Sequence, residues 1–204
     1  MSKTRFRTAA VIGTGMMGPG IAATLALGGV HATILSRSEE NAAKGVDAAR
    51  AQLRVLAENG LAEPVEVREA WDRIDSSSAF DPTVEKVDLA IESAPENMDL
   101  KQKLFARLDA VAERSAVLAS DTSGLSITAI ASRCRHPERV LTTHFWNPPH
   151  LMPLVEIVQG EKTSPEGRTS LCRLRKTAGP IRAARSPDRA CAIVSSPPVS
   201  TLPS

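Results

Sequence analysis

One segment late in the chain carries two side chains that can exchange a proton at neutral pH. His144 ends one apolar run, Arg139–Phe145, and Glu156 lies within the next, Leu154–Gln159. The connection between them contains three prolines, which fix φ and remove backbone donors, so we expect a stiff bend between two strands. An imidazole held by a carboxylate is the minimal arrangement for general acid–base catalysis. Alone, this pair decides little, because a His and a Glu so close in sequence are often unrelated.

A glycine-rich turn follows the first apolar run of the chain and opens a helical stretch. Gly13 would make the tight turn, Gly15 would let the backbone approach a pyrophosphate, and Gly18 would let helix and strand pack closely. The helix N-terminus would offer N–H groups and a positive dipole end to the phosphates. The alternative is a turn that holds no ligand. The residues that we expect to contact a dinucleotide here are Gly13, Gly15, Met16, Met17 and Gly18.

The second apolar run ends without the acidic residue that usually binds the adenosine ribose of NAD. It continues as Ser36-Arg37-Ser38, and the first acids, Glu39 and Glu40, fall in the next helix. A serine and an arginine suit the 2′-phosphate of NADP, because guanidinium pairs with phosphate. Alternatively, Arg37 is solvated and Glu39 binds the ribose after a small shift. The sequence therefore leaves NAD and NADP both open as cofactors.

The glycine-rich turn and the His144–Glu156 segment together resemble the NAD-binding domain of the L-3-hydroxyacyl-CoA dehydrogenases, such as 3-hydroxybutyryl-CoA dehydrogenase. Two segments between them agree. Glu92–Phe105 is similar to the family's stretch after the fourth strand, and Ser120-Asp-Thr-Ser123 is similar to its Ser-Asn-Thr-Ser loop. The resemblance covers about Thr8 to Arg175. It implies oxidation of the 3-hydroxyl of a 3-hydroxyacyl-CoA, or the reverse reduction, with an acyl-CoA as the substrate.

The resemblance also implies catalytic roles for four residues. His144 would be the general base that takes the hydroxyl proton, and Glu156 would orient it and stabilise its protonated form. Ser123 would hydrogen-bond the substrate oxygen, and Asn147 would lie near the nicotinamide and the substrate. For Ser123 there is a simpler alternative, which is to cap a helix that begins near Ser126.

Four further charged residues have both a functional and a simpler interpretation. The resemblance places Glu96 and Lys101 at the cofactor, but they could be a solvent-facing pair at the start of a helix. Arg50 and Arg54 could meet CoA phosphates, although a solvated helix face is the preferred interpretation. No metal site is expected, because His31, His136 and His150 and the cysteines Cys134, Cys172 and Cys191 lack ligand spacing.

Alternating strands and helices predict an α/β fold, a doubly wound Rossmann domain with a mainly parallel sheet. The expected strands are Thr8–Ile12, Ala32–Ser36, Val87–Glu92, Ala116–Ser120, Val140–Phe145 and Leu154–Gln159. The expected helices are Met16–Gly28, Glu39–Asn59, Glu63–Trp71, Leu100–Arg114, Ser126–Arg133 and Pro165–Thr177.

The composition, with 42% hydrophobic residues among 204, is ordinary for a soluble domain. No apolar run is long enough for a membrane span and no signal peptide is evident, so we expect a cytoplasmic protein without a membrane partner. Met1–Leu171 carries 19 basic and 22 acidic residues, whereas the rest carries six and one. The basic pI of about 8.6 is thus a property of the tail, and no nucleic-acid partner is predicted.

The sequence changes character after about Arg175 and becomes rich in Pro, Ser and Ala. We expect a dinucleotide-binding domain over residues 1–185 and a disordered or aberrant tail over 186–204. The resembling family has a C-terminal helical domain that dimerises, which is expected to be absent here, so a monomer or weak oligomer is predicted. A shift of reading frame near Arg185 would account for the change.

Three functions therefore stay open. The first is an NAD(P)-dependent 3-hydroxyacyl-CoA dehydrogenase, whose activity the absence of the helical domain would impair. The second is a CoA-independent hydroxy-acid dehydrogenase of the gulonate or carnitine type, which shares the His–Glu arrangement. The third is a catalytically weak nucleotide-binding remnant.

Overall fold

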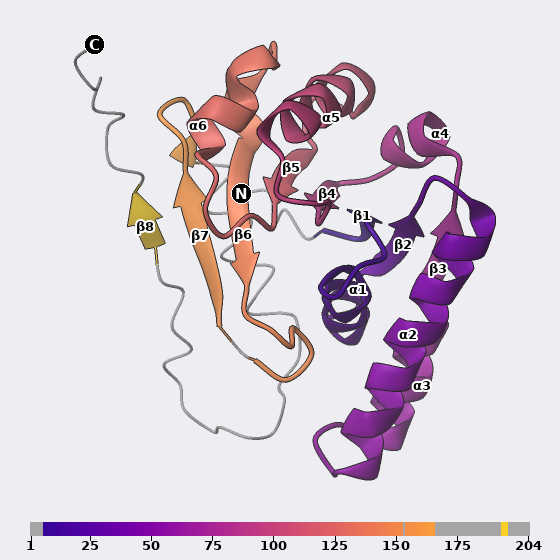
Figure 1. Cartoon of the computed structure of the whole chain (residues 1–204). Coiled ribbons are helices and arrows are strands. Elements are labelled where there is room, and N and C mark those ends of the chain that lie inside the picture. Colours follow the sequence, from indigo (N-terminus) through magenta and orange to yellow (C-terminus); the bar gives the residue numbers. More distant parts are fainter. Residues whose placement is uncertain (1–5, 153, 166–192, 196–204) are drawn as a thin grey trace.

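The fold is built on one sheet that runs through the molecule, as a computed structural model describes it for residues 6–152, 154–165 and 193–195. The strand order is β3-β2-β1-β4-β5-β6-β7-β8 (Figure 1). The strands are β1 (Thr8–Ile12), β2 (His31–Leu35), β3 (Ile74–Ser77), β4 (Leu89–Glu92), β5 (Val117–Ser120), β6 (Val140–Phe145), β7 (Val155–Gln159) and β8 (Ile193–Ser195).

From β3 to β6 every neighbouring pair of strands is parallel. β7 runs antiparallel to β6, and β8 runs parallel to β7. The chain first moves outward from β1 to β3, then returns to β4 on the other side of β1 and continues outward. This order is the doubly wound Rossmann arrangement with a mainly parallel sheet, which confirms the predicted fold class.

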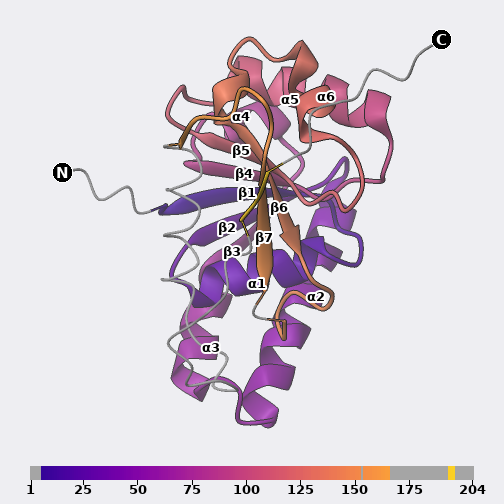
Figure 2. The ribbon, with the colours of Figure 1, turned by 90° about the vertical axis from the view of Figure 1, so that its left-hand side faces the viewer.

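Helices cover both faces of the sheet. Figure 2 shows α4, α5 and α6 on one side of the strands and α1, α2 and α3 on the other. The α-helices are α1 (Gly18–Leu27), α2 (Glu39–Glu58), α3 (Pro64–Trp71), α4 (Phe80–Val84), α5 (Met98–Val111) and α6 (Ile127–Ile130), followed by the 3-10 turns η1 (Ala131–Arg133) and η2 (Pro137–Arg139). No described helix is both long and apolar enough to cross a membrane.

The strand sequences explain why two hydrophobic cores form. Successive side chains of a strand point to opposite faces, so in β1 Ala9 and Val11 enter one core while Ala10 enters the other. In β4, Leu89 and Ile91 join the first core and Ala90 the second. Strands that are buried on both faces are apolar throughout, which is why their positions could be read from the sequence.

The structure adds elements that the sequence did not predict. β3 was missed because only Ile74 of its four residues is buried, and α4 because it is one short turn. The boundaries of most predicted elements hold within a few residues. The helix expected at Pro165–Thr177 lies outside the described residues apart from Pro165, and so does most of the segment 186–204. Within that segment Ile193–Ser195 is described and pairs with β7.

Candidate active site

The predicted site residues gather at one edge of the sheet. β1, β2, β4, β5 and β6 are parallel, so the loops that follow their carboxyl ends all lie at this edge. The order of the strands reverses between β1 and β4, and ligands of open α/β sheets bind outside the strand ends at such a point. β7 is antiparallel to β6, so the start of β7 reaches the same edge.

The glycine-rich turn has the backbone geometry that its glycines suggested. Gly13 has φ +123°, and a side chain there would collide with the carbonyl oxygen of Ser93. A side chain at Gly18 would collide with the carbonyl oxygen of Gly13. At Gly15, by contrast, a Cβ would meet nothing within 4 Å. The turn is therefore closed on its protein side and open at Gly15, as a backbone that approaches a pyrophosphate must be.

The N-terminus of α1 is free to receive an anion. The N-cap residue, Met17, makes no side-chain capping hydrogen bond, and the first turn of α1 contains no acidic residue. Unpaired N–H groups and the helix dipole favour negative charge at this position. Met16 is exposed, and its Sδ lies 3.2 Å from Asn147 Nδ2 in the loop after β6. The structure thus joins the glycine-rich turn to the segment that contains His144.

His144 and Glu156 face each other across the antiparallel ladder of β6 and β7. His144 Nδ1 lies 2.7 Å from Glu156 Oε2, and both side chains are just over one-quarter exposed. Opposite residues of an antiparallel pair have neighbouring side chains, so strand register alone brings the two together. The tilted ring of Trp146 lies near the imidazole, with 6.3 Å between the ring centroids.

The contact with Glu156 selects one form of the imidazole. An ionised carboxylate has no proton to give, so Nδ1 must carry the proton of this hydrogen bond. In a neutral imidazole Nε2 then keeps its lone pair and can accept a proton. The pair can therefore act as a general base through Nε2, with Glu156 supporting the charge that forms.

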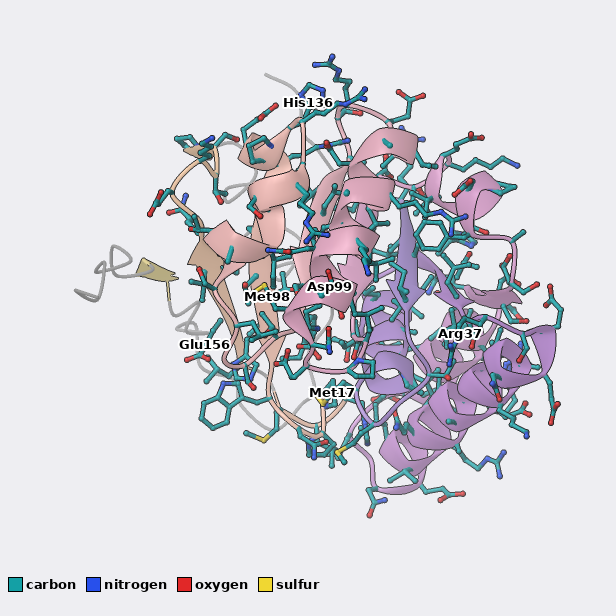
Figure 3. All side chains as sticks on the ribbon, turned by 45° about the horizontal axis from the view of Figure 1, so that its top comes forward. Met17, Arg37, Met98, Asp99, His136 and Glu156 are labelled. Atoms are coloured by element: carbon teal, nitrogen blue, oxygen red, sulfur yellow. The ribbon has the colours of Figure 1, made fainter. Side chains whose placement is uncertain are left out.

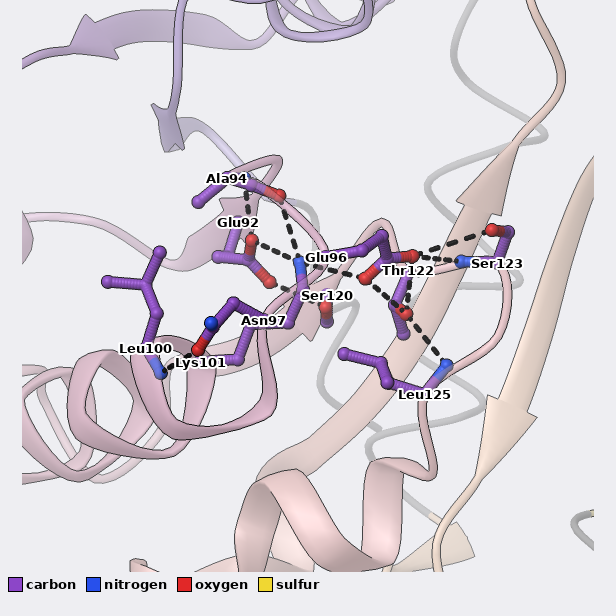
Figure 4. Close-up of polar contacts among 10 residues, drawn as sticks. All are labelled: Glu92, Ala94, Glu96, Asn97, Leu100, Lys101, Ser120, Thr122, Ser123 and Leu125. Atoms are coloured by element: carbon purple, nitrogen blue, oxygen red, sulfur yellow. Dashed lines mark hydrogen bonds and ion pairs between the residues drawn. The ribbon is translucent and has the colours of Figure 1, made fainter.

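A buried ion pair joins β4 and α5 at the same sheet edge. Lys101 is 1% exposed, and its Nζ lies 2.6 Å from Glu92 Oε1 and donates to the carbonyl oxygen of Ala94. Glu92 also accepts hydrogen bonds from the Ala94 N–H and from the Ser120 hydroxyl (Figure 4). Every polar atom of the pair thus has a partner. The alternative of a solvent-facing Lys101 is wrong, because the lysine is buried.

Lys101 also connects to the loop that contains Ser123. Its Nζ lies 3.5 Å from Glu96 Oε2, and Glu96 Oε1 accepts from the Thr122 hydroxyl and the Ser123 N–H (Figure 4). Burial opposes ionisation of Glu96, but these two donors and the ammonium group together hold its pKa below its usual value. The capping alternative for Ser123 is wrong, since Ser126 is the N-cap of α6. Ser123 stays exposed.

Asp121 is a residue of this region that sequence reasoning missed. It follows β5, and its Oδ1 accepts a hydrogen bond from the backbone N–H of Phe145, the residue after His144. Burial is the main cause that raises the pKa of Asp121 to about 7, and the charge of Glu92 adds to it, while the Phe145 N–H, His144 and Lys101 act in the opposite direction. The available signal was its place in the loop, where the resembling sequence has Asn.

We call His144, Glu156 and the Glu92–Lys101–Glu96 network the β6 corner, and Ser36, Arg37 and Ser38 the β2 corner. Figure 3 shows Glu156 and Arg37 on opposite sides of Met17. Arg37 is exposed, and no hydrogen bond or ion pair joins it to another described residue. Ser38 is the N-cap of α2, where it accepts from the Asn41 N–H.

Other predicted candidates lie away from these corners. Arg50 is over the ring of Trp71, 6.0 Å from its centroid, and Arg54 is exposed on α2. Among the described residues, no group of three or more His, Cys, Asp or Glu side chains is arranged to hold a metal ion. His150 is buried, and its burial lowers its pKa. Cys172 and Cys191 lie outside the described residues.

Comparisons with known proteins show the family to which this chain is related. Residues 8–183 match the family described as "3-hydroxyacyl-CoA dehydrogenase, NAD binding domain". The chain is 37% identical over 169 residues to the probable 3-hydroxybutyryl-CoA dehydrogenase of Bacillus subtilis, covering 83% of this chain and 58% of that protein. It is 33% identical over 177 residues to the 5-formyl-3-hydroxy-2-methylpyridine 4-carboxylate 5-dehydrogenase of Mesorhizobium japonicum, covering 85% of this chain and 55% of the relative.

A solved structure extends the agreement to the fold. The (S)-3-hydroxybutyryl-CoA dehydrogenase of Ralstonia eutropha superimposes with a TM-score of 0.84 at 30% identity, covering 95% of this chain and 65% of that one. The chain thus spans a little over half the length of the two curated relatives above. The family match over most of the chain and the relatives above 30% identity lead to one conclusion: this chain belongs to the 3-hydroxyacyl-CoA dehydrogenase family and carries its NAD-binding domain.

Proposed function

We propose that this chain binds a nicotinamide adenine dinucleotide and acts in the oxidation of a 3-hydroxyacyl-CoA, or in the reverse reduction of a 3-ketoacyl-CoA. The observation that carries the proposal is the His144–Glu156 pair, which lies at the same sheet edge as the glycine-rich turn. A proton acceptor and a dinucleotide site at one edge are the two requirements of hydride transfer from an alcohol.

The residues of the glycine-rich turn fit the phosphates of the cofactor. Gly15 leaves the backbone open, and the N-terminus of α1 has neither a side-chain cap nor an acidic residue in its first turn. Gly13, Gly15, Met16, Met17 and Gly18 would hold the pyrophosphate. When bound, the nicotinamide supplies the hydride chemistry, and the protein supplies position and proton transfer.

The role of His144 follows from the state of its two nitrogens. With Nδ1 donating to Glu156, Nε2 takes the proton of the 3-hydroxyl as the carbon is oxidised, and returns it in the reduction. Glu156 keeps the ring in place and stabilises its protonated form. Ser123, at the end of the Glu96 network, holds the substrate oxygen, and Asn147, whose amide lies beside Met16, would be near the nicotinamide and the substrate.

Glu96 and Lys101 have unequal roles in this proposal. Glu96 is 45% exposed in its side chain and can meet the cofactor directly. Lys101 is buried and acts through Glu96, because its ammonium group adds to the hydrogen bonds from the Ser123 N–H and the Thr122 hydroxyl that hold this carboxylate in place. Lys101 is thus a positioning residue, and Glu96 is the one that contacts the dinucleotide.

Two alternatives rest on specific observations. The Mesorhizobium relative is named for a pyridine carboxylate substrate, so a CoA-independent substrate is the second candidate. A dinucleotide-binding protein with little turnover is the third candidate, because the matched family model is that of an NAD-binding domain and the glycine-rich turn fits a dinucleotide on its own. The oligomeric state is a separate question, and sedimentation of the purified chain measures it.

The decisive experiment combines binding and turnover on the same preparation. The chain is titrated with NADH and NADPH by calorimetry, and reduction of acetoacetyl-CoA is followed by loss of nucleotide absorbance. Binding with turnover is the expected result. Binding without turnover of acetoacetyl-CoA, but with turnover of a CoA-free keto acid, replaces the substrate assignment. Binding without turnover of either contradicts the enzymatic proposal and favours the third candidate.

A further inference from the structure

The β2 corner lacks the negative charge that an NAD site normally has. The position after β2 is Ser36, and no acidic residue stands between Leu35 and Ser38. Gly13 N–H donates to the Leu35 carbonyl oxygen at 3.0 Å, so Ser36 directly follows the residue that is bonded to the glycine-rich turn. In dinucleotide-binding domains this is the position where the adenosine ribose meets the protein.

Neither Glu39 nor Glu40, the next acidic residues in the sequence, takes the place of the missing carboxylate at position 36. Glu39 Oε1 accepts hydrogen bonds from the Ser78 hydroxyl at 2.6 Å and from the Ser78 N–H at 3.2 Å. Ser78 follows β3, which lies on the side of β2 away from β1, so these bonds hold the carboxylate away from the ribose position. Glu40 forms an ion pair with Lys44 at 2.7 Å. The idea that Glu39 binds the ribose is therefore at odds with its contacts.

Arg37 is the charged residue of the Ser36–Ser38 segment. It is exposed, and no described residue pairs with its guanidinium. A guanidinium offers a fork of donors that matches a phosphate, and a serine hydroxyl adds one donor beside it. An anion bound at this position would contact the Arg37 guanidinium and the Ser36 hydroxyl, and no carboxylate at position 36 would repel it.

We infer that Ser36 and Arg37 form a subsite for the 2′-phosphate of the adenosine, and that this chain binds NADP(H) more tightly than NAD(H). The inference rests on the proposed function in that a dinucleotide must occupy the glycine-rich turn. It deepens that function by naming the residues that choose the cofactor. NAD(H) still binds through the pyrophosphate turn, but without the charge-assisted pair at its ribose.

The test measures binding without any need for turnover. Calorimetry compares NADPH with NADH, and 2′,5′-ADP with 5′-AMP, the second pair lacking the nicotinamide entirely. We expect the 2′-phosphorylated member of each pair to bind about 10-fold to 100-fold more tightly, the range of one charge-assisted contact. Because Arg37 is exposed, the ratio should fall as ionic strength rises.

Three variants assign the effect to residues. Arg37→Gln should remove most of the preference for NADPH and leave NADH binding within about twofold, because only the 2′-phosphate uses the guanidinium. Ser36→Asp should reverse the preference, because a carboxylate binds a ribose diol and repels a phosphate. Arg54→Gln is the matched control, since Arg54 is also an exposed arginine of this part of the chain, and should change neither constant.

The possible failures are distinguishable. NADH binding as tight as or tighter than NADPH, with no effect of Arg37→Gln on either, overturns the inference and leaves the proposed function intact. Failure of both dinucleotides to bind a folded chain overturns the proposed function and the inference with it. Equal loss of NADPH affinity in Arg37→Gln and Arg54→Gln would indicate a general charge effect and also contradict the subsite.

Discussion

The β6 corner and the β2 corner lie at the same sheet edge but are built in opposite ways. In the β6 corner, Lys101 and Glu92 are buried and each of their polar atoms is bonded within the protein. In the β2 corner, Arg37 is exposed and unpaired among the described residues. The buried ion pair of the β6 corner has all its hydrogen bonds without a ligand. In the β2 corner, the exposed Arg37 would gain a partner only when an anion binds.

The difference matches the role proposed for each corner. The proton transfer proposed for His144 would require a tautomer and a position that are set in advance, and strand pairing and the Glu156 carboxylate fix both. Choosing between two cofactors that differ by one phosphate requires only a charge of the right sign. Substitutions in the β6 corner should therefore affect turnover or stability, and those of Ser36 and Arg37 in the β2 corner should affect cofactor preference alone.

The largest effect is expected from His144→Gln. Loss of the base should lower kcat for acetoacetyl-CoA reduction by about 100-fold to 10,000-fold, while affinity for the dinucleotide stays unchanged. Steady-state kinetics and calorimetry measure the two quantities. His31→Gln is the matched control, because His31 is exposed at the amino end of β2, far along the strand from this edge. Retention of kcat in His144→Gln would remove His144 from the mechanism.

The next largest effect is expected from Lys101→Met. Removing one partner of a buried ion pair leaves Glu92 as an uncompensated buried charge, which costs about 3–5 kcal/mol of unfolding free energy. The double variant Lys101→Met with Glu92→Gln removes that charge and should regain a large part of the loss. Denaturant unfolding of the single and double variants checks this. An equal loss in both would show that packing, not charge, is what the lysine contributes.

A smaller, pH-dependent effect is expected from Asp121→Asn. Burial raises the pKa of Asp121 to about 7 from 3.8, so the folded protein binds this proton more tightly than the unfolded chain does. The contribution of Asp121 to the free energy of unfolding is therefore complete at low pH and is lost as the pH rises from about 4 through about 7. The asparagine side chain of the variant cannot ionise, yet its carbonyl oxygen can accept the same hydrogen bond from the Phe145 N–H.

The variant should therefore lose less stability than the parent chain between pH 5 and pH 8, by an amount on the order of a few kcal/mol at most. Thermal unfolding at several pH values measures the difference. Parallel pH profiles for both proteins would show that Asp121 does not titrate in this range.

The smallest effect is expected from Glu39→Gln, at the start of α2 beside the β2 corner. Glu39 is exposed and bonded to Ser78, so the change should cost about 1 kcal/mol or less and should leave the ratio of NADPH to NADH affinity unaltered. Calorimetry with both dinucleotides and denaturant unfolding test the two parts. A marked loss of NADH affinity would mean that Glu39 leaves Ser78 to bind the ribose.

Much of this arrangement could be predicted because it depends on local patterns. β1 and the glycine-rich turn combine an apolar run with a glycine spacing that is typical of dinucleotide-binding domains. The approach of His144 to Glu156 needed only two strands and a bend. The exact register could not be predicted, because a proline-rich connection of this length allows several pairings.

The partners of buried charges could not be predicted either. In the sequence Lys101 follows an acidic segment at a helix start and looks like a surface residue, yet the packing of α5 on β4 brings it to Glu92. Asp121 accepts from Phe145, 24 residues away, through a strand contact that no local pattern reveals. Such contacts depend on tertiary packing, which overrides local preference.

The antiparallel pairing of β6 with β7 also has a consequence for how such proteins can diverge. A slip of one residue in this ladder would turn Glu156 to the opposite face of the sheet. An insertion in the loop between the strands leaves the ladder unaltered, because loops absorb changes in length. That loop carries the exposed apolar side chains of Trp146, Leu151 and Met152. Related chains can therefore vary this loop while they keep the contact between His144 and Glu156.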